Sequence, residues 1–231
     1  MKLEQTKIGD AKVIVDILPK GKCIPNTGIK PTSITIHQTG NIGASAKANH
    51  NYMKNINKSG ERIASWHFTV DDVNIYQAID TNKKAYHAGC TSGNNTSIGI
   101  EICMFNNASK QIKAYKNAIA LVKVLMNEYS FNINKVKRHY DWTKKNCPQW
   151  LISGKYGYNW SWFKTQLKGA TSYLVKINVD ELNVREGCGV SYPIKAVVKQ
   201  GEVYTITETK GSWGKLKSGV GWINLNYTIK P

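Results

Sequence analysis

The sequence lacks any apolar run long enough to cross a membrane. Nowhere do about 18 apolar residues follow one another, as a membrane span requires, and residues 1–7 lead into no apolar core of signal-peptide length. The five cysteines are odd in number and widely spaced, so they do not form the pattern of a disulfide framework. We therefore expect a protein without a signal peptide that is synthesised in a reducing cytoplasm.

Acidic residues are also scarce. The 231 residues include 15 acidic and 32 basic side chains, a formal net charge of +17, which indicates a polyanionic environment or partner. Up to residue 171 there are 24 basic and 10 acidic residues (+14), and after it 8 and 5 (+3). The lysines are scattered rather than gathered in an arm or a basic helix, so solubility and long-range attraction are favoured over specific nucleic-acid binding.

One stretch of the chain combines two metal-binding residue types. His139 and Cys147 lie eight residues apart, and Pro148 follows the cysteine; imidazole and thiolate are ligands that zinc prefers. Both could instead be ordinary interior residues, since free cysteine is among the most buried types. His37 ends the apolar run 33–37 just before a glycine-containing loop, a place where ligands and catalytic groups collect. Three such ligands would leave one tetrahedral position open to water, as in catalytic zinc sites.

Glu101 is a single acidic residue within the apolar run 98–104. A carboxylate in a buried strand is costly unless it is paired or faces a polar site. We therefore favour a functional role for Glu101 over a structural ion pair.

The periodicity of the first 168 residues predicts an α/β architecture. Strand-like runs alternate with segments whose apolar residues recur at steps of three and four. Asp71 and Asp72 join two of the strands into a predicted hairpin, and His50 is placed on the surface of the first helix. Strands separated by helices indicate a mixed central β-sheet flanked by helices. The predicted strands are 12–18, 33–37, 66–70, 73–79 and 98–104, and the predicted helices are 45–56, 109–130 and 160–167.

The character of the chain changes after this region. Residues 169–172 are small and polar and are predicted to form a linker. From residue 173 on, short strand-like runs are separated by glycines, which predicts a small all-β barrel. These runs are 174–177, 202–207, 212–216 and 221–224. We thus expect two domains, 1–168 and 173–231.

Five segments in the first domain carry a family resemblance. They are 34–40 (ITIHQTG), 65–72 (SWHFTVDD), 85–89 (AYHAG), 97–102 (SIGIEI) and 138–148 (RHYDWTKKNCP). Together, and in this order, they resemble the zinc-dependent N-acetylmuramoyl-L-alanine amidases of phage endolysins, bacterial autolysins and animal peptidoglycan recognition proteins. The resemblance implies a helix-flanked sheet with Zn2+ at its edge, held by His37, His139 and Cys147.

The tail resembles a bacterial SH3-type domain through 182–185, 199–202, 211–215 and 219–223. The resemblance implies that the tail binds peptidoglycan and keeps the first domain on its substrate. The alternative is a stabilising appendage without binding, because fold underdetermines function.

The amidase resemblance also implies catalytic residues. Glu101 matches the acidic residue of the family's Ile-Glu segment and is the candidate general base. Lys145 matches a position whose lysine or threonine stabilises the tetrahedral intermediate, whereas the neighbouring Lys144 should be far less sensitive to replacement.

Other residues in the matching segments are candidates for the walls of the site. Trp66 stands where some phage amidases carry a catalytic tyrosine, and without a hydroxyl it is expected to pack or to line the groove. Trp66, Thr39 and His87 are predicted to contact substrate, with a position behind the metal ligands as the alternative for His87. His67 is expected to be a hydrogen-bonding wall of the site.

The leading interpretation is a peptidoglycan hydrolase of the endolysin type that cleaves the bond between N-acetylmuramic acid and the L-alanine of the stem peptide. Its partner would be the bacterial wall, with teichoic acids as a further attraction for the positive charge, and it would act there after release from the host cytoplasm. One alternative is a protein that binds peptidoglycan without cutting it. Another is a cysteine hydrolase with Cys147 as nucleophile and His139 as base. A zinc deaminase is set aside, because the paired-cysteine pattern is missing.

Overall fold

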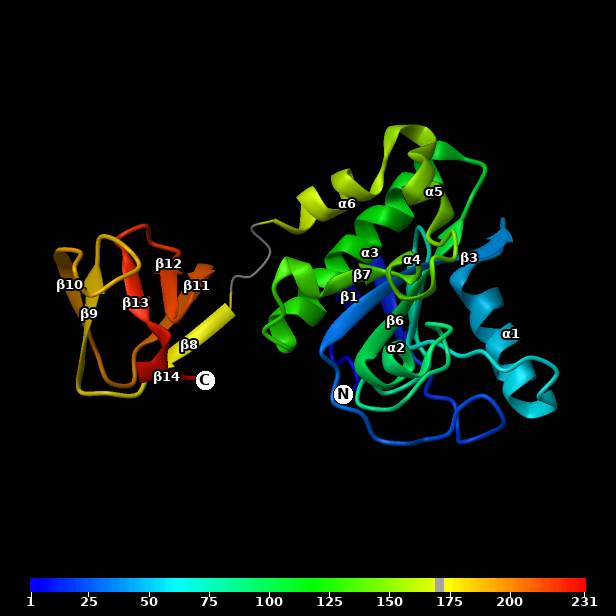
Figure 1. The fold of residues 1–231 in the computed structure, drawn as a ribbon, viewed down its shortest axis with the longest axis horizontal. Coiled ribbons are helices and arrows are strands. Elements are labelled where there is room, and N and C mark those ends of the chain that lie inside the picture. The colour runs from blue at the N-terminus through cyan, green and yellow to red at the C-terminus, as the bar shows by residue number, and fades with distance from the viewer. Residues whose placement is uncertain (169–172) are drawn as a thin grey trace. The chain divides into compact units, whose positions relative to one another are not determined.

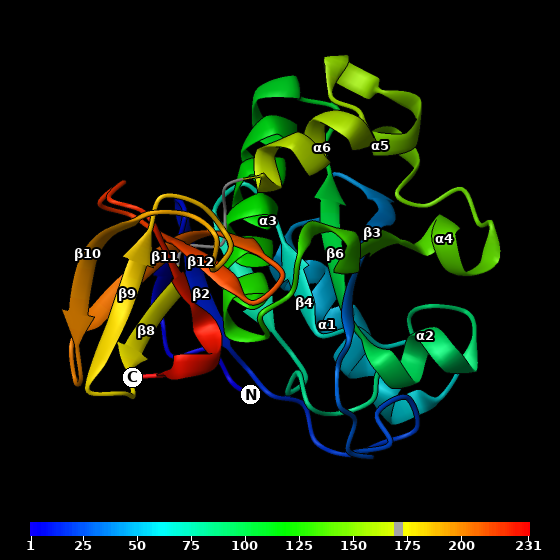
Figure 2. The ribbon, with the colours of Figure 1, turned by 60° about the vertical axis from the view of Figure 1, so that its left-hand side comes forward.

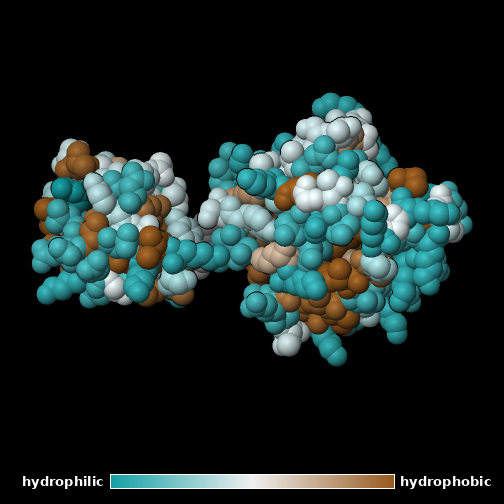
Figure 3. Space-filling view, turned by 90° about the horizontal axis from the view of Figure 1, so that it is seen from below, coloured by the Kyte–Doolittle hydropathy of each residue, from teal (hydrophilic) through white to brown (hydrophobic). Residues whose placement is uncertain are grey.

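The computed structural model describes residues 1–168 and 173–231, which divide into two compact units, 1–167 and 168–231 (Figure 1). The predicted linker 169–172 lies outside the described residues. No helix in the described parts of the chain is both long and apolar enough to span a bilayer. Polar residues predominate on the face shown in Figure 3, and apolar side chains appear there in separate patches.

The N-terminal unit is built on a mixed sheet, as predicted; the sheet has seven strands, of which β1 and β7 were not predicted. Strands β7, β3, β6 and β4 run parallel, β5 is antiparallel to β4, and β2 is parallel to β5. In spatial order the strands are β1 (Lys7–Ile8), β2 (Ala11–Val15), β5 (Asn74–Gln77), β4 (Phe68–Val70), β6 (Ser97–Met104), β3 (Ser33–Ile42) and β7 (Val136–Arg138). The carboxyl ends of four parallel strands therefore share one edge, where ligands bind in open α/β sheets.

Helices cover both faces of this sheet. The long helix α3 (Ala108–Glu128) presents Tyr115 to the side chain of Gln38 on β3, whereas Asn49 of α1 (Ala46–Ser59) reaches Cys103 on β6. Because side chains alternate along a strand, one face carries the buried Ile98, Ile100 and Ile102 and the other carries Gly99, Glu101 and Cys103. Helix α6 (Trp160–Leu167) lies against α3 (Figure 2).

The remaining helices are short. Two of them, α2 (Thr91–Thr96) and η1 (Ile133–Lys135), directly precede β6 and β7, whereas α4 (His139–Thr143) directly follows β7 at its carboxyl end. The chain then forms α5 (Gln149–Ser153) and η2 (Lys155–Gly157).

Helix α1 has the ends that its sequence predicts but a different buried face. The Ser45 hydroxyl accepts a hydrogen bond from the Ala48 amide, and Gly60 ends the helix with a left-handed φ of 72°, which a glycine adopts without steric penalty. The placement of His50 on the surface was wrong. His50 is 1% exposed and its Nε2 lies 2.8 Å from Asp16 Oδ2, because it shares a helical face with the buried Met53.

Strand β3 runs farther than predicted. The apolar run ends at His37, yet the strand continues to Ile42 with a shift of register against β6 between Gln38 and Ile42. Gly40 permits this irregularity with a φ of 67°. The result is a polar strand extension beyond the buried sheet.

The C-terminal unit is a seven-stranded antiparallel sheet around an apolar core. Its strands, in spatial order, are β10 (Ile194–Lys199), β9 (Glu181–Arg185), β13 (Trp222–Asn224), β12 (Trp213–Leu216), β11 (Val203–Lys210), β8 (Tyr173–Ile177) and β14 (Thr228–Ile229); η3 (Leu225–Tyr227) precedes the last. Among residues 173–231, β10 pairs only with β9 and β14 only with β8. The all-β prediction is confirmed, but the described strands do not close into the predicted barrel.

Candidate metal centre and active site

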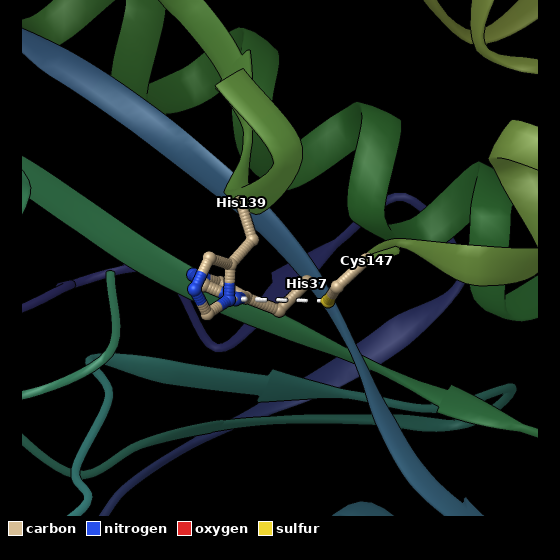
Figure 4. A group of neighbouring side chains, drawn as sticks. All are labelled: His37, His139 and Cys147. Atoms are coloured by element: carbon tan, nitrogen blue, oxygen red, sulfur yellow. Dashed lines mark hydrogen bonds between the residues drawn. The ribbon is translucent and has the colours of Figure 1, made fainter. Parts of the chain in front are cut away.

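Sheet register brings two distant histidines together. His37 lies on β3, and His139 is the first residue of α4, directly after β7. Strands β3 and β7 are neighbours, with Ile36 opposite Arg138. The next residue of each strand therefore reaches the same edge of the sheet, and Figure 4 shows the two rings beside the side chain of Cys147.

A short loop returns Cys147 to this place. Asp141 accepts a hydrogen bond from the Arg138 amide and pairs with its guanidinium, which caps the first turn of α4. Lys144 ends the helix in the left-handed region with a φ of 63°. The Tyr140 amide then donates to the Cys147 carbonyl at 2.9 Å, so the chain turns back beside its own starting point.

The three side chains present their ligand atoms to one point. His37 Nδ1 lies 3.0 Å from His139 Nδ1 and 3.8 Å from Cys147 Sγ, and all three ligand atoms lie within 4.8 Å of one another. The donor atoms of a tetrahedral zinc ion are about 3.3 to 3.6 Å apart, given Zn–N distances of about 2.0 to 2.1 Å and Zn–S of about 2.3 Å. Two imidazole nitrogens and one sulfur in this arrangement fit a tetrahedral divalent metal.

Burial keeps the imidazoles neutral. It lowers the pKa of His37 well below its usual range, and the nearby His87 and His139 act in the same direction. Burial, followed by the charge of Lys145, lowers the pKa of His139 to about 4. Neutral rings keep the lone pairs that a metal ion needs.

For Cys147, burial disfavours the form that binds a metal, because the ligand is the thiolate and not the thiol. Burial first, and then the charge of Glu101, raises the pKa of its thiol to about 12. A thiol in such surroundings is not a reactive nucleophile, but a bound cation deprotonates it.

Glu101 lies beside His37 on the neighbouring strand, and the two residues are in register. Burial raises the pKa of its carboxyl group to about 7, opposed by the positive charges of Lys145 and Arg62. Within the described parts of the chain its buried Oε2 has no hydrogen-bond partner. A carboxylate with a pKa near neutrality and a free oxygen is suited to accept and return a proton.

Cys147 and Glu101 open onto a pocket of about 530 Å³, whose lining includes neither His37 nor His139. Cys147, Glu101 and Lys145 line it together with Thr39 and Trp66. The buried hydroxyl of Thr39 is unpartnered among residues 1–168 and 173–231, while the indole nitrogen of Trp66 donates to Thr69 at 2.6 Å. Lys144 is not part of the lining; its ammonium lies 5.2 Å from the ring of Tyr140.

The two other histidines of the matching segments lie behind the pocket. His87 does not line it; its Nδ1 is 3.0 Å from His37 Nε2. The His67 ring accepts a hydrogen bond from the Gly99 amide and lies 2.8 Å from the Lys83 carbonyl. Of the residues predicted to contact substrate, Thr39 and Trp66 thus reach the pocket directly, whereas His87 reaches only a candidate ligand.

Several pocket residues gave no signal in the sequence. Asn49 and Tyr52 line the pocket from one turn of α1, Arg62 from the segment after Gly60, and Gln149 from the start of α5. The three-residue spacing of Asn49 and Tyr52 places them on one helical face. No local pattern distinguishes Arg62 from the other basic residues of a chain with 32 of them.

Comparison with known proteins identifies the N-terminal region. A family model described as N-acetylmuramoyl-L-alanine amidase matches residues 27–150. Two Bacillus subtilis proteins are similar: N-acetylmuramoyl-L-alanine amidase XlyA, 38% identical over 187 residues (78% of this chain), and CwlH, 42% identical over 134 residues (55% of this chain). The aligned regions cover 59% and 51% of those proteins, so the chain spans little more than half the length of these relatives.

Solved structures give the same result. The catalytic domain of XlyA superimposes with a TM-score of 0.60 at 37% identity, covering 68% of this chain and 99% of that domain. PlyL superimposes with a TM-score of 0.59 at 30% identity, covering 70% of this chain and 98% of the other. The chain therefore belongs to the N-acetylmuramoyl-L-alanine amidase family.

Proposed function

We propose that this protein hydrolyses the amide bond between N-acetylmuramic acid and the L-alanine of the peptidoglycan stem. The observation that carries the proposal is the meeting of His37, His139 and Cys147 at one point, where Cys147 lines a pocket together with Glu101 and Lys145. The names of the related Bacillus proteins support the same reaction.

Zinc is the metal that we assign to the three ligands, because it is commonly bound by imidazole and thiolate in tetrahedral sites. When bound, it would supply a water of lowered pKa and an electrophile for the substrate carbonyl. Three protein ligands leave the fourth position for this chemistry.

Glu101 acts as the general base and then as the general acid. Its free oxygen takes a proton from the attacking water as the new C–O bond forms. It returns that proton to the alanine nitrogen as the C–N bond breaks, which leaves a carboxylic acid on the lactyl group and a free amine on the peptide. A pKa near 7 allows both transfers.

Lys145 stabilises the oxyanion that develops on the carbonyl oxygen. It lines the pocket and lies close enough to Glu101 to lower the pKa of that carboxyl group. A positive charge in this position stabilises the transition state more than the neutral ground state.

Arg62 is the other cation that we assign to substrate binding. Its side chain lines the pocket and, within the described residues, makes no hydrogen bond or ion pair. Its carbonyl accepts a hydrogen bond from the buried Cys23 thiol at 2.9 Å, which anchors the main chain. An arginine held in this way suits a carboxylate of the stem peptide.

The C-terminal unit, residues 173–231, is proposed to hold the enzyme on the wall, with 1–168 as the catalytic domain. This layout of a catalytic domain followed by a wall-binding unit is that of an endolysin made in the host cytoplasm and acting on the wall after release. The positive charge of the chain would favour a wall rich in teichoic acid phosphates.

The cysteine hydrolase is less well supported. A thiol with a pKa of about 12 is almost wholly protonated at neutral pH. A binding protein without activity would leave the arrangement of Glu101 and Lys145 unexplained.

Purified cell walls test the proposal. We expect turbidity to fall when the protein is added, lysis to stop with a chelator, and zinc to restore it. Mass spectrometry of the digest should find new N-terminal alanine. A new reducing sugar end, or lysis that chelation does not affect, would contradict the assignment.

A further inference from the structure

Two consecutive residues, His87 and Ala88, contact the two candidate histidine ligands on the side away from the metal position. His87 Nδ1 lies 3.0 Å from His37 Nε2, and the Ala88 carbonyl accepts a hydrogen bond from the ring of His139. Neither residue lines the pocket. The segment 85–89 matched the family pattern, but the proposed reaction gives it no chemical role.

Which ring donates in the hydrogen bond between His37 and His87 follows from the second hydrogen bond of the His87 ring. His87 Nε2 lies 3.1 Å from the Ser97 carbonyl, which can only accept, so Nε2 carries the proton. His87 is buried, and an imidazole that carries its one proton on Nε2 has its lone pair on Nδ1. His37 Nε2 must therefore donate to His87, and the lone pair of the neutral His37 ring is left on Nδ1.

The second contact has the same effect on His139. Its Nδ1 faces His37 at 3.0 Å, so the nitrogen that donates to the Ala88 carbonyl is Nε2. That nitrogen lies beside Gly89, whose hypothetical Cβ would be 3.2 Å away. Both Nδ1 atoms thus direct lone pairs at one point, and two lone pairs that face each other can share a cation but cannot hydrogen-bond to each other.

We propose that His87 is a positioning residue that, together with the Ala88 carbonyl, sets the tautomers of His37 and His139 so that both present Nδ1 to the metal. The inference rests on the metal site of the proposed function and gives His87 a role other than contact with substrate. Partners of this kind orient metal ligands and raise their basicity.

The surroundings of His87 hold its ring in this position. The side chain of Asn94 accepts hydrogen bonds from the amides of both His87 and Ala88, at 2.9 and 2.8 Å. A Cβ on Gly99 would approach the His87 ring to 2.6 Å, so only glycine lets the ring lie against β6. The Ser97 carbonyl that accepts the hydrogen bond from His87 Nε2 belongs to the same strand.

Metal affinity of the full chain, measured by competition with a chromophoric chelator, tests the proposal. His87→Phe keeps a ring but removes the acceptor, and we expect zinc to bind about 10- to 100-fold more weakly. His87→Gln offers an amide oxygen and should recover most of the loss. His50→Gln, in a buried histidine that contacts Asp16 and no candidate ligand, is the matched control and should bind zinc as the wild type does.

Nitrogen-15 NMR of the metal-free wild type tests the tautomers directly and covers the case in which His87→Phe does not fold. We expect protonated Nε2 and unprotonated Nδ1 in both His37 and His139. The opposite tautomers, or a folded His87→Phe protein with wild-type zinc affinity, would overturn the proposal. Neither readout requires hydrolysis, so a protein that binds zinc in this way but leaves walls intact would contradict the proposed function alone.

Discussion

The two units differ in what they bury. Every polar or charged side chain that is buried among the described residues lies in the N-terminal unit, between Ser33 and His139. The C-terminal unit buries a purely apolar cluster that includes Val184, Ile206 and Ile223.

Burial of polar groups is unfavourable unless hydrogen bonds replace water, and the N-terminal unit supplies such bonds by stacking imidazoles, carbonyls and amides behind the pocket. The comparison teaches that chemical function concentrates where buried polarity is tolerated. A sheet with an apolar core can offer only its outer surface to a partner.

Removing a candidate metal ligand from the N-terminal unit should have the largest effect on activity. Cys147→Ala takes away the proposed sulfur ligand, so we expect zinc binding to be lost and wall lysis to fall by at least about 1,000-fold, since a bound metal would supply both nucleophile and electrophile. Cys90→Ser is the control, because a serine hydroxyl at that N-cap position can replace the cysteine sulfur as the acceptor that caps α2. Substantial lysis by Cys147→Ala would remove the basis of the metal site.

Glu101→Gln should separate activity from stability. We expect lysis to fall by about 100- to 10,000-fold through loss of the proposed general base. The folded state raises the pKa of Glu101 from 4.5 to about 7, so the free energy of unfolding of the wild type, relative to that of the variant, should fall as pH rises through this interval. The buried histidines titrate in both proteins and cancel in this difference.

Thermal unfolding of chelator-treated wild type and Glu101→Gln between pH 4 and 8 measures that difference. A constant gap between the two proteins across this range would show that Glu101 does not titrate as inferred.

The neighbours Lys145 and Lys144 form a matched pair. Lys145→Ala removes the positive charge that lines the pocket, and a loss of about 100- to 1,000-fold in kcat is expected, as for other oxyanion-stabilising groups. Lys144→Ala removes the same charge from outside the lining and should stay within about threefold of the wild type. Equal losses in the two variants would point to net charge rather than to position.

A substitution in the apolar core of the C-terminal unit tests whether that unit contributes to wall binding and not to catalysis. Ile206 is fully buried, and Ile206→Ala should destabilise that unit by about 2 to 5 kcal/mol. We expect weaker sedimentation with cell walls but normal hydrolysis of a soluble muropeptide. Loss of the soluble activity would show that catalysis depends on the C-terminal unit.

Arg62→Ala should have the smallest effect of these substitutions, and it tests whether Arg62 recognises a carboxylate of the stem peptide. We expect about a tenfold rise in KM for a muropeptide with a free stem carboxylate, relative to the same peptide with a carboxamide. Arg62→Lys should restore part of the discrimination, because a point charge replaces a planar, bidentate donor. An equal change for both peptides would mean that Arg62 does not recognise that carboxylate.

Much of the fold was predictable from local pattern. Helix α6 has the predicted bounds, 160–167, and strand β6 begins within one residue of its prediction, because apolar periodicity is a local property. The burial of His50 was missed, since its partner Asp16 lies 34 residues away on another element.

The sequence by itself determined which residues could hold a metal, since imidazole and thiol chemistry belongs to the residue type, and it marked Glu101 as a charge in an apolar strand. Only the tertiary structure decided that His37 and His139, 102 residues apart, meet through the β3–β7 register, that His87 lies behind them, and that Arg62 reaches the pocket. These relations depend on strand pairing and on hydrogen bonds between distant segments, which no local pattern encodes.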